Sequence, residues 1–110
     1  MSNNGTLARR VEARLREVFM VQGPFTDLDV KGPDGWARHV VAIHDRPGSS
    51  VRVELDILGD RKIGALAARA VLALAGRQHT DLQAVEVVNV GGERLGYRRR
   101  KDLPMFGGPR

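Results

Sequence analysis

The apolar residues of this chain follow two spacings, one typical of helices and one typical of strands. Near the start, apolar positions lie three or four residues apart, which predicts a helix over residues 7–20 with one apolar face. Thr6 is placed to cap this helix, and Gly23-Pro24 ends it. The apolar positions of this face are Leu7, Val11, Leu15, Val18 and Phe19.

A second helical pattern covers residues 61–75, where Asp60 is the expected N-cap and Gly76 the stop. Leu66 belongs to the stripe predicted to be buried, so we expect a Leu66→Asp substitution to unfold the domain. Alanines on the neighbouring rows would let this helix approach a sheet closely. The apolar stripe consists of Ile63, Leu66, Ala67, Ala70, Val71 and Leu74.

Alternation of apolar and polar residues predicts the strands. It is clearest over residues 51–57, and a strand over 36–44 precedes it, so we expect an antiparallel hairpin across the turn at 46–49. The remaining predicted strands are a short edge strand at 25–31, a strand at 82–90 and a possible last strand at 95–100.

In chain order the predicted elements are α-β-β-β-α-β, with a possible further strand. The economical arrangement is an α+β fold, in which both helices pack on one face of a mainly antiparallel sheet. A chain of 110 residues is most simply one domain. We place that domain at residues 6–101, between a flexible N-terminus (1–5) and an irregular C-terminal tail (102–110).

The composition excludes several kinds of site and indicates where the protein is located. The sequence contains no cysteine, which excludes disulfides and thiolate sites. It has no long apolar run and no apolar stretch resembling a signal peptide at its start, so we expect no contact with a membrane. We therefore expect a cytoplasmic protein, or a part of an assembly that is made inside a cell.

Positive charge is concentrated near the C-terminus. The net charge is +5, and residues 91–110 hold six cationic side chains against two carboxylates, so the first 90 residues are nearly neutral. Such a strip favours a local contact with a partner. Its densest part is Arg98, Arg99, Arg100 and Lys101, which follow Tyr97. These cations are candidates for contact with a partner protein or with nucleic acid, where the tyrosine would stack on bases.

Metal-binding patterns are weak. His39 and His44 would lie on opposite faces of one strand, and His79 lies in a polar connector, so we expect no metal site. Gly59 and Gly64 have a spacing similar to that of the glycines in a phosphate-binding loop. That loop requires a lysine and a Ser or Thr directly after the second glycine, and this chain has Ala65 and Leu66 there.

Catalytic patterns are weak as well. The carboxylate pairs Asp27/Asp29 and Glu54/Asp56 are expected on the solvent face of the sheet, paired with arginines, rather than in acid–base catalysis. No nucleophile motif surrounds Ser49. We expect no catalytic residue, no metal and no cofactor, and therefore not an enzyme.

Residues 50–76, SVRVELDILGDRKIGALAARAVLALAG, resemble the strand, cap and alanine-rich helix of phage tail-terminator and tail-completion proteins. The resemblance extends to the first helix and to the strand DLQAVEVVNVG. It implies a non-enzymatic subunit that forms a homo-oligomeric ring at the tail end, joins the tail tube to the head connector, and meets neighbouring virion proteins. The basic strip would meet DNA or the adjoining ring. The expected docking residues are Arg46, Pro47, Gly48, Ser49, Ser50, Arg94 and Tyr97.

A second resemblance is to double-stranded RNA-binding domains, whose order is α-β-β-β-α. Residues 24–35 (PFTDLDVKGPDG) are similar to the first strand and turn of that family, and RKIGALAARAVLAL to its last helix. The chain departs from the family before this helix, where Glu54, Asp56 and Asp60 would oppose a polyanion. The alternative function is thus a small nucleic-acid-binding module, of this type or acting through the basic strip.

Overall fold

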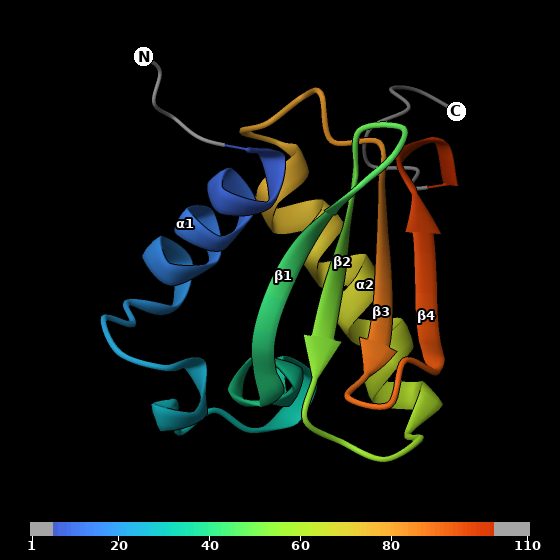
Figure 1. Cartoon of the computed structure of the whole chain (residues 1–110). Coiled ribbons are helices and arrows are strands. Elements are labelled where there is room, and N and C mark those ends of the chain that lie inside the picture. The colour runs from blue at the N-terminus through green and yellow to red at the C-terminus, as the bar shows by residue number, and fades with distance from the viewer. Residues whose placement is uncertain (1–5, 103–110) are drawn as a thin grey trace.

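The computed structural model describes residues 6–102, which form a four-stranded sheet with two α-helices packed on one face (Figure 1). The predicted flexible N-terminus, and the predicted tail beyond Asp102, lie outside the described residues. The elements are α1 (Leu7–Phe19), β1 (Val40–Arg46), β2 (Ser50–Leu55), α2 (Arg61–Gly76), β3 (Ala84–Asn89) and β4 (Arg94–Arg99), with 3-10 helices at Phe25–Asp27, Gly32–His39 and Arg100–Asp102.

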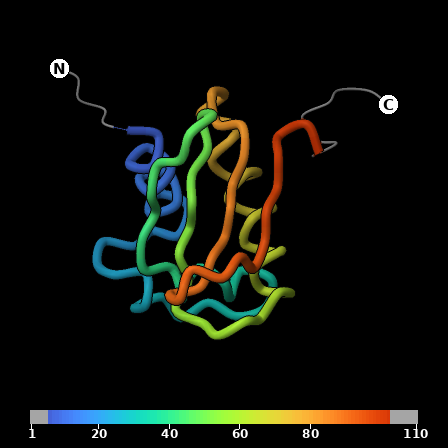
Figure 2. The backbone as a smooth tube through the Cα atoms, turned by 45° about the vertical axis from the view of Figure 1, so that its right-hand side comes forward, coloured from blue at the N-terminus to red at the C-terminus, as the bar shows by residue number. Residues whose placement is uncertain are grey.

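The sheet has the strand order β1-β2-β3-β4, so each strand pairs with its neighbour in the sequence. The β1/β2 and β3/β4 pairs are antiparallel, and the β2/β3 pair is parallel. A parallel pair needs a crossover, and α2 supplies it behind the sheet (Figure 2). The predicted α+β class and the predicted hairpin are confirmed.

The predicted edge strand over residues 25–31 is wrong. Phe25–Asp27 forms a 3-10 turn that buries Phe25. Arg16 of α1 holds this turn, because its Nη1 donates to the Gly23 carbonyl at 2.6 Å and its guanidinium lies 4.7 Å from the centre of the Phe25 ring. An alternating strand could not make this inward turn.

The strand predicted over residues 36–44 begins later, at Val40. Residues 32–39 instead form a 3-10 helix that buries Trp36 against α1. The rings of Trp36 and Phe19 meet edge to face, with 5.6 Å between their centres. The tryptophan must reach the helix side of the sheet, and the tight helix places it there.

The first helix is fixed at its start by two oxygens. Thr6 Oγ1 accepts a hydrogen bond from the Arg9 amide at 3.3 Å, which confirms the predicted cap. Asp45 Oδ1 accepts one from the Ala8 amide at 2.9 Å. Because Asp45 lies on β1, this second bond ties α1 to the edge of the sheet.

The second helix has the predicted cap, and its buried face overlaps the predicted one at Ala67 and Val71 but is turned away from Leu66. Asp60 Oδ1 accepts from the amides of Lys62 at 3.0 Å and Ile63 at 3.1 Å. Leu66 is 46% exposed, so its predicted place in the core is wrong. The helix turns its small residues inward, since Gly64 contacts the backbone of β4. Its buried side chains are Ala67, Ala68, Val71, Leu72 and Ala75.

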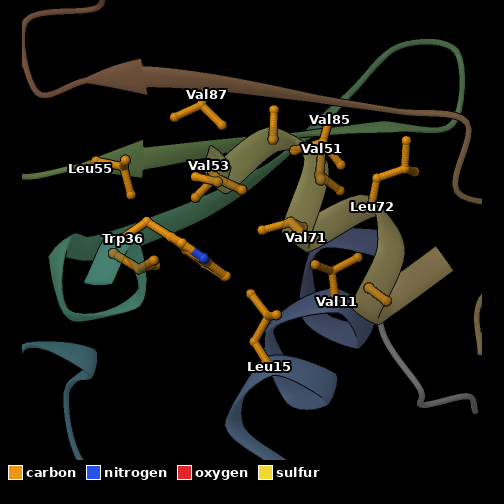
Figure 3. Packing of buried hydrophobic residues seen from close by; sticks show 14 of the residues in the cluster. Val11, Leu15, Trp36, Val51, Val53, Leu55, Val71, Leu72, Val85 and Val87 are labelled. Atoms are coloured by element: carbon orange, nitrogen blue, oxygen red, sulfur yellow. The ribbon is translucent and has the colours of Figure 1, made fainter. Parts of the chain in front are cut away.

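The core fills the space between the two helices and one face of the sheet. Figure 3 shows Val11 and Leu15 of α1 facing the valines of β2 and β3, with Val71 of α2 between them. Trp36 closes the end of this core near Val53. The opposite face of the sheet takes no part in this cluster and remains available for function.

Candidate functional site: the open face of the sheet

The face of the sheet that points away from the helices, here called the open face, carries charged or ionisable side chains on all four strands and Tyr97 on β4. Arg52 alternates with the buried valines of β2, so its side chain lies on the open face. The strand register pairs His44 with Arg52, Arg52 with Glu86, and Glu86 with Tyr97. These four residues therefore form one row across the sheet.

Glu86 is the buried carboxylate at the centre of this face, with an exposure of 8%. Its Oε1 accepts a hydrogen bond from Arg52 Nε at 2.9 Å, and its Oε2 accepts one from Arg94 Nε at 3.0 Å. Arg46 Nε lies 3.6 Å from Oε1. Three guanidinium groups, from β1, β2 and β4, thus surround one carboxylate on β3.

The arginines keep Glu86 ionised. Burial by itself raises the pKa of this carboxyl, because a carboxylate loses hydration inside the protein. Hydrogen bonds from Arg52 and Arg94 outweigh the burial, and the pKa of Glu86 is lowered overall. One negative charge therefore neutralises one of the three arginines, and the other positive charges stay at the surface.

The terminal nitrogens of these arginines remain available to an outside acceptor. Arg52 and Arg94 bind Glu86 through Nε, and within residues 6–102 the Nη atoms of Arg46, Arg52 and Arg94 make no hydrogen bond to protein. The Arg94 guanidinium also stacks over the ring of Tyr97, 4.9 Å from its centre. Oriented guanidinium groups of this kind match a phosphate or a carboxylate.

Two adjoining pockets, each of about 340 Å³, lie between the hairpin turn and β4. The first is lined by Arg46, Pro47, Ser50, Glu86, Arg94 and Tyr97. The second is lined by Pro47, Gly48, Ser50, Gln83, Ala84, Tyr97, Arg99 and Lys101. The predicted docking residues of the turn and of β4, although distant in the sequence, are thus brought together, with Ser49 in the same turn. We name Arg46, Arg52, Arg94, Arg99, Lys101 and Tyr97, around Glu86, the arginine surface.

The basic strip is divided between two faces. Tyr97 lies on the open face opposite Glu86, and Arg99 follows it there by alternation. Arg98 pairs with Val85 and points to the helix side. Arg99 is held by Asp102, with 3.1 Å between Nε and the carboxylate oxygen.

Arg100 stabilises the fold by binding backbone carbonyl groups. Its guanidinium donates to the carbonyls of Leu82 at 2.8 Å, Gly76 at 2.9 Å and His79 at 3.2 Å. The arginine therefore fastens the end of α2 and the loop before β3, and we leave it out of the proposed contact surface.

Arg52 and Glu86 are the site residues that sequence reasoning missed. Glu86 is the single charged residue in an otherwise mostly apolar strand, AVEVVN, and such a buried carboxylate requires partners. That signal indicates an ion pair. The identity of the partners follows only from the register of β2, β3 and β4.

The other candidate residues do not gather into a site. His44 Nε2 lies 3.2 Å from Glu54 Oε1, while His39 is in a 3-10 helix. Asp27 and Asp29 no longer share a strand face, since that strand is absent from the described residues. Among residues 6–102, no three His, Asp or Glu side chains are grouped to hold a metal ion.

Free amides in the first turn of α2 already have a hydrogen-bond partner within the protein. Asp60 accepts from those of Lys62 and Ile63, and Arg61 Nη2 lies 3.4 Å from a Glu93 oxygen. The amides that Asp60 caps are therefore not part of the candidate anion site.

No protein-family model, curated protein or solved structure matches the chain, so both resemblances stay predictions. In the part of the chain that is described, no helix has the length and apolar character needed to cross a membrane.

Proposed function

We propose that the protein is a non-enzymatic docking subunit of a larger assembly, and that it attaches to an anionic partner through the arginine surface. The observation that carries this proposal is the convergence of Arg46, Arg52 and Arg94 on the buried Glu86. Three separate strands supply these cations, and their free donors face solvent. Such a surface is suited to the recognition of negative charge.

The resemblance to tail-terminator and tail-completion proteins suggests which assembly this is. We propose a homo-oligomeric ring at the end of a phage tail, where the subunit meets its own copies and neighbouring virion proteins. The cytoplasm would be the place of assembly and the virion the final location. The arginine surface would be the part of the subunit that meets the anionic neighbour.

The double-stranded RNA alternative loses its structural support. That family has three strands before its last helix, whereas residues 25–31 form no strand and two strands follow α2. The alternative that we keep is nucleic-acid contact through the basic strip, part of which lies on the open face.

Heparin affinity chromatography tests anionic docking without assuming the partner. We expect Arg46→Gln and Arg94→Gln to elute at lower salt than the wild type. Arg69→Gln is the matched control, because Arg69 is exposed on α2, on the other side of the sheet. If all three variants elute together, docking through the arginine surface is refuted.

Light scattering on the full chain tests the ring. The proposal expects a mass several times that of the 12.1 kDa chain, rising to a plateau with concentration. A monomer at every concentration would contradict the ring while leaving anionic docking open to the heparin result.

A further inference from the structure

The guanidinium groups of Arg52 and Arg94 are held in place by Glu86 before any partner arrives. Glu86 accepts one Nε–H from Arg52 and one from Arg94, and this leaves the outer edges of both groups open. The side chains of Arg46, Arg52 and Arg94 are 41%, 35% and 58% exposed. Because the buried carboxylate already orders Arg52 and Arg94, binding an anion costs less side-chain entropy than it would for free surface arginines.

The cations extend beyond one anion-sized site. They continue from the hairpin turn, where Arg46 lies, through the first pocket to Lys101 beside the second, where Arg99 is paired with Asp102. A single carboxylate would use one end of this surface. A linear polyanion with regularly spaced charges can contact both pockets at once, and a phosphodiester backbone is such a polyanion.

Tyr97 lies between the two pockets and lines both. Its side chain is 44% exposed, although Arg94 stacks on its ring. An exposed ring beside phosphate-binding arginines suits an unpaired base, which stacks on it. The bases of a duplex are already stacked on each other and cannot reach a ring on an open sheet.

We propose that the anionic partner is single-stranded nucleic acid, with its phosphates on Arg46, Arg52 and Arg94 and one base on Tyr97. This inference rests on the proposed docking function and names its partner. Carboxylate-rich protein surfaces and duplexes are the competing partners that the experiment separates.

Fluorescence anisotropy with a labelled single-stranded oligonucleotide, over a series of salt concentrations, is the test. The comparison ligands are the duplex of the same sequence and a labelled polyglutamate peptide. We expect the single strand to bind at least tenfold more tightly than either comparison ligand, with affinity that falls steeply as salt rises.

The arginine and tyrosine variants give different readouts. Arg46→Gln removes a phosphate contact, so it should reduce the slope of log K against log salt by about 0.7. Tyr97→Leu should weaken binding about tenfold and leave that slope unchanged, because stacking releases no counterion. Tyr97→Phe keeps the ring and Arg69→Gln lies on the opposite side, so both should bind like the wild type.

Three results would overturn the inference: equal affinity for the duplex, equal affinity for polyglutamate, or a Tyr97→Leu protein that binds like Tyr97→Phe. Retention on heparin that depends on Arg46, combined with any of these results, would sustain the docking function and reject single-stranded nucleic acid as the partner. Loss of heparin dependence would reject both. Circular dichroism melting of each variant confirms that the folded protein is being compared.

Discussion

Gly64 of α2 and Gly96 of β4 lie in direct backbone contact. A β-carbon added to Gly96 would overlap the carbonyl group of Gly64, and one added to Gly64 would overlap Leu95. The helix therefore approaches the outer strand as closely as its backbone permits. This contact sets how α2 lies on the sheet and so which of its side chains are buried.

Gly96→Ala should be strongly destabilising. The atoms in its way belong to the backbone and cannot rotate aside, so we expect a loss of about 3 kcal/mol in the free energy of unfolding. Urea denaturation measures it. Gly35→Ala is the control, because its β-carbon would approach only the Val30 carbonyl, at 3.9 Å. Equal midpoints for the two variants would contradict the close contact.

Leu66→Asp should leave the protein folded. Its side chain is 46% exposed, so the charge stays hydrated and we expect a change of about 1 kcal/mol or less. Leu72, one of the fully buried side chains, should behave differently, since Leu72→Ala leaves a cavity and costs about 3 kcal/mol. Thermal unfolding of the two variants side by side checks this order, and the reverse order would show that the helix face is misplaced.

The helix was predictable from the sequence, but only part of its buried face was, namely Ala67 and Val71. Periodicity defines a helix over 61–75 and allows either of two adjacent stripes to be buried. The larger residues, Leu66 and Leu74, favoured one stripe on hydrophobicity alone. The Gly64–Gly96 contact turns the helix toward the row of Gly64, Ala68 and Leu72, because a side chain at position 64 would overlap β4.

Glu86 should make the free energy of unfolding depend on pH in the acidic range. Its folded-state pKa is lowered from the ordinary value of 4.5, so it stabilises the fold above that value. This contribution is lost as the pH falls through the lower folded-state pKa. We expect Glu86→Gln to lose about 1–2 kcal/mol at neutral pH, where arginines are left without their counter-charge.

The measurement is urea denaturation of both proteins from about pH 6 to about pH 3. The wild type should lose stability more steeply, and the gap between the two proteins should narrow as the pH falls. Parallel curves would mean that the carboxylate carries no net stabilising charge in the folded protein.

Arg100 should matter for stability and not for binding. Arg100→Met removes charged donors from three carbonyl groups, and we expect a loss of about 2 kcal/mol, or roughly 10 °C in Tm. Arg98→Met, at the half-exposed position two residues earlier, should change Tm much less. If the two variants melt together, the carbonyl contacts contribute nothing.

Sequence reasoning found most residues of the candidate site but not their arrangement. The turn at 46–49 and the cations after Tyr97 were visible as local patterns. Their meeting depends on the parallel pairing of β2 with β3, which sets Arg52 beside Glu86, and on the antiparallel pairing of β3 with β4, which sets Glu86 beside Tyr97. Pairing between strands separated by a crossover helix leaves no local signature. A truncation after Gly92 would delete β4 together with its core residue Leu95 and so destabilise the fold. Point substitutions therefore test the basic strip more cleanly than a truncation does.

The position of Trp36 gives this protein an internal optical reporter. It is the chain's single tryptophan, 1% exposed, and it lies among core side chains on the helix side of the sheet. A ligand on the open face would be separated from the indole by the thickness of the sheet. Emission from the indole should therefore shift on denaturation and stay constant during a titration. A shift during a titration would then indicate that the fold is being lost, and not that a ligand is bound.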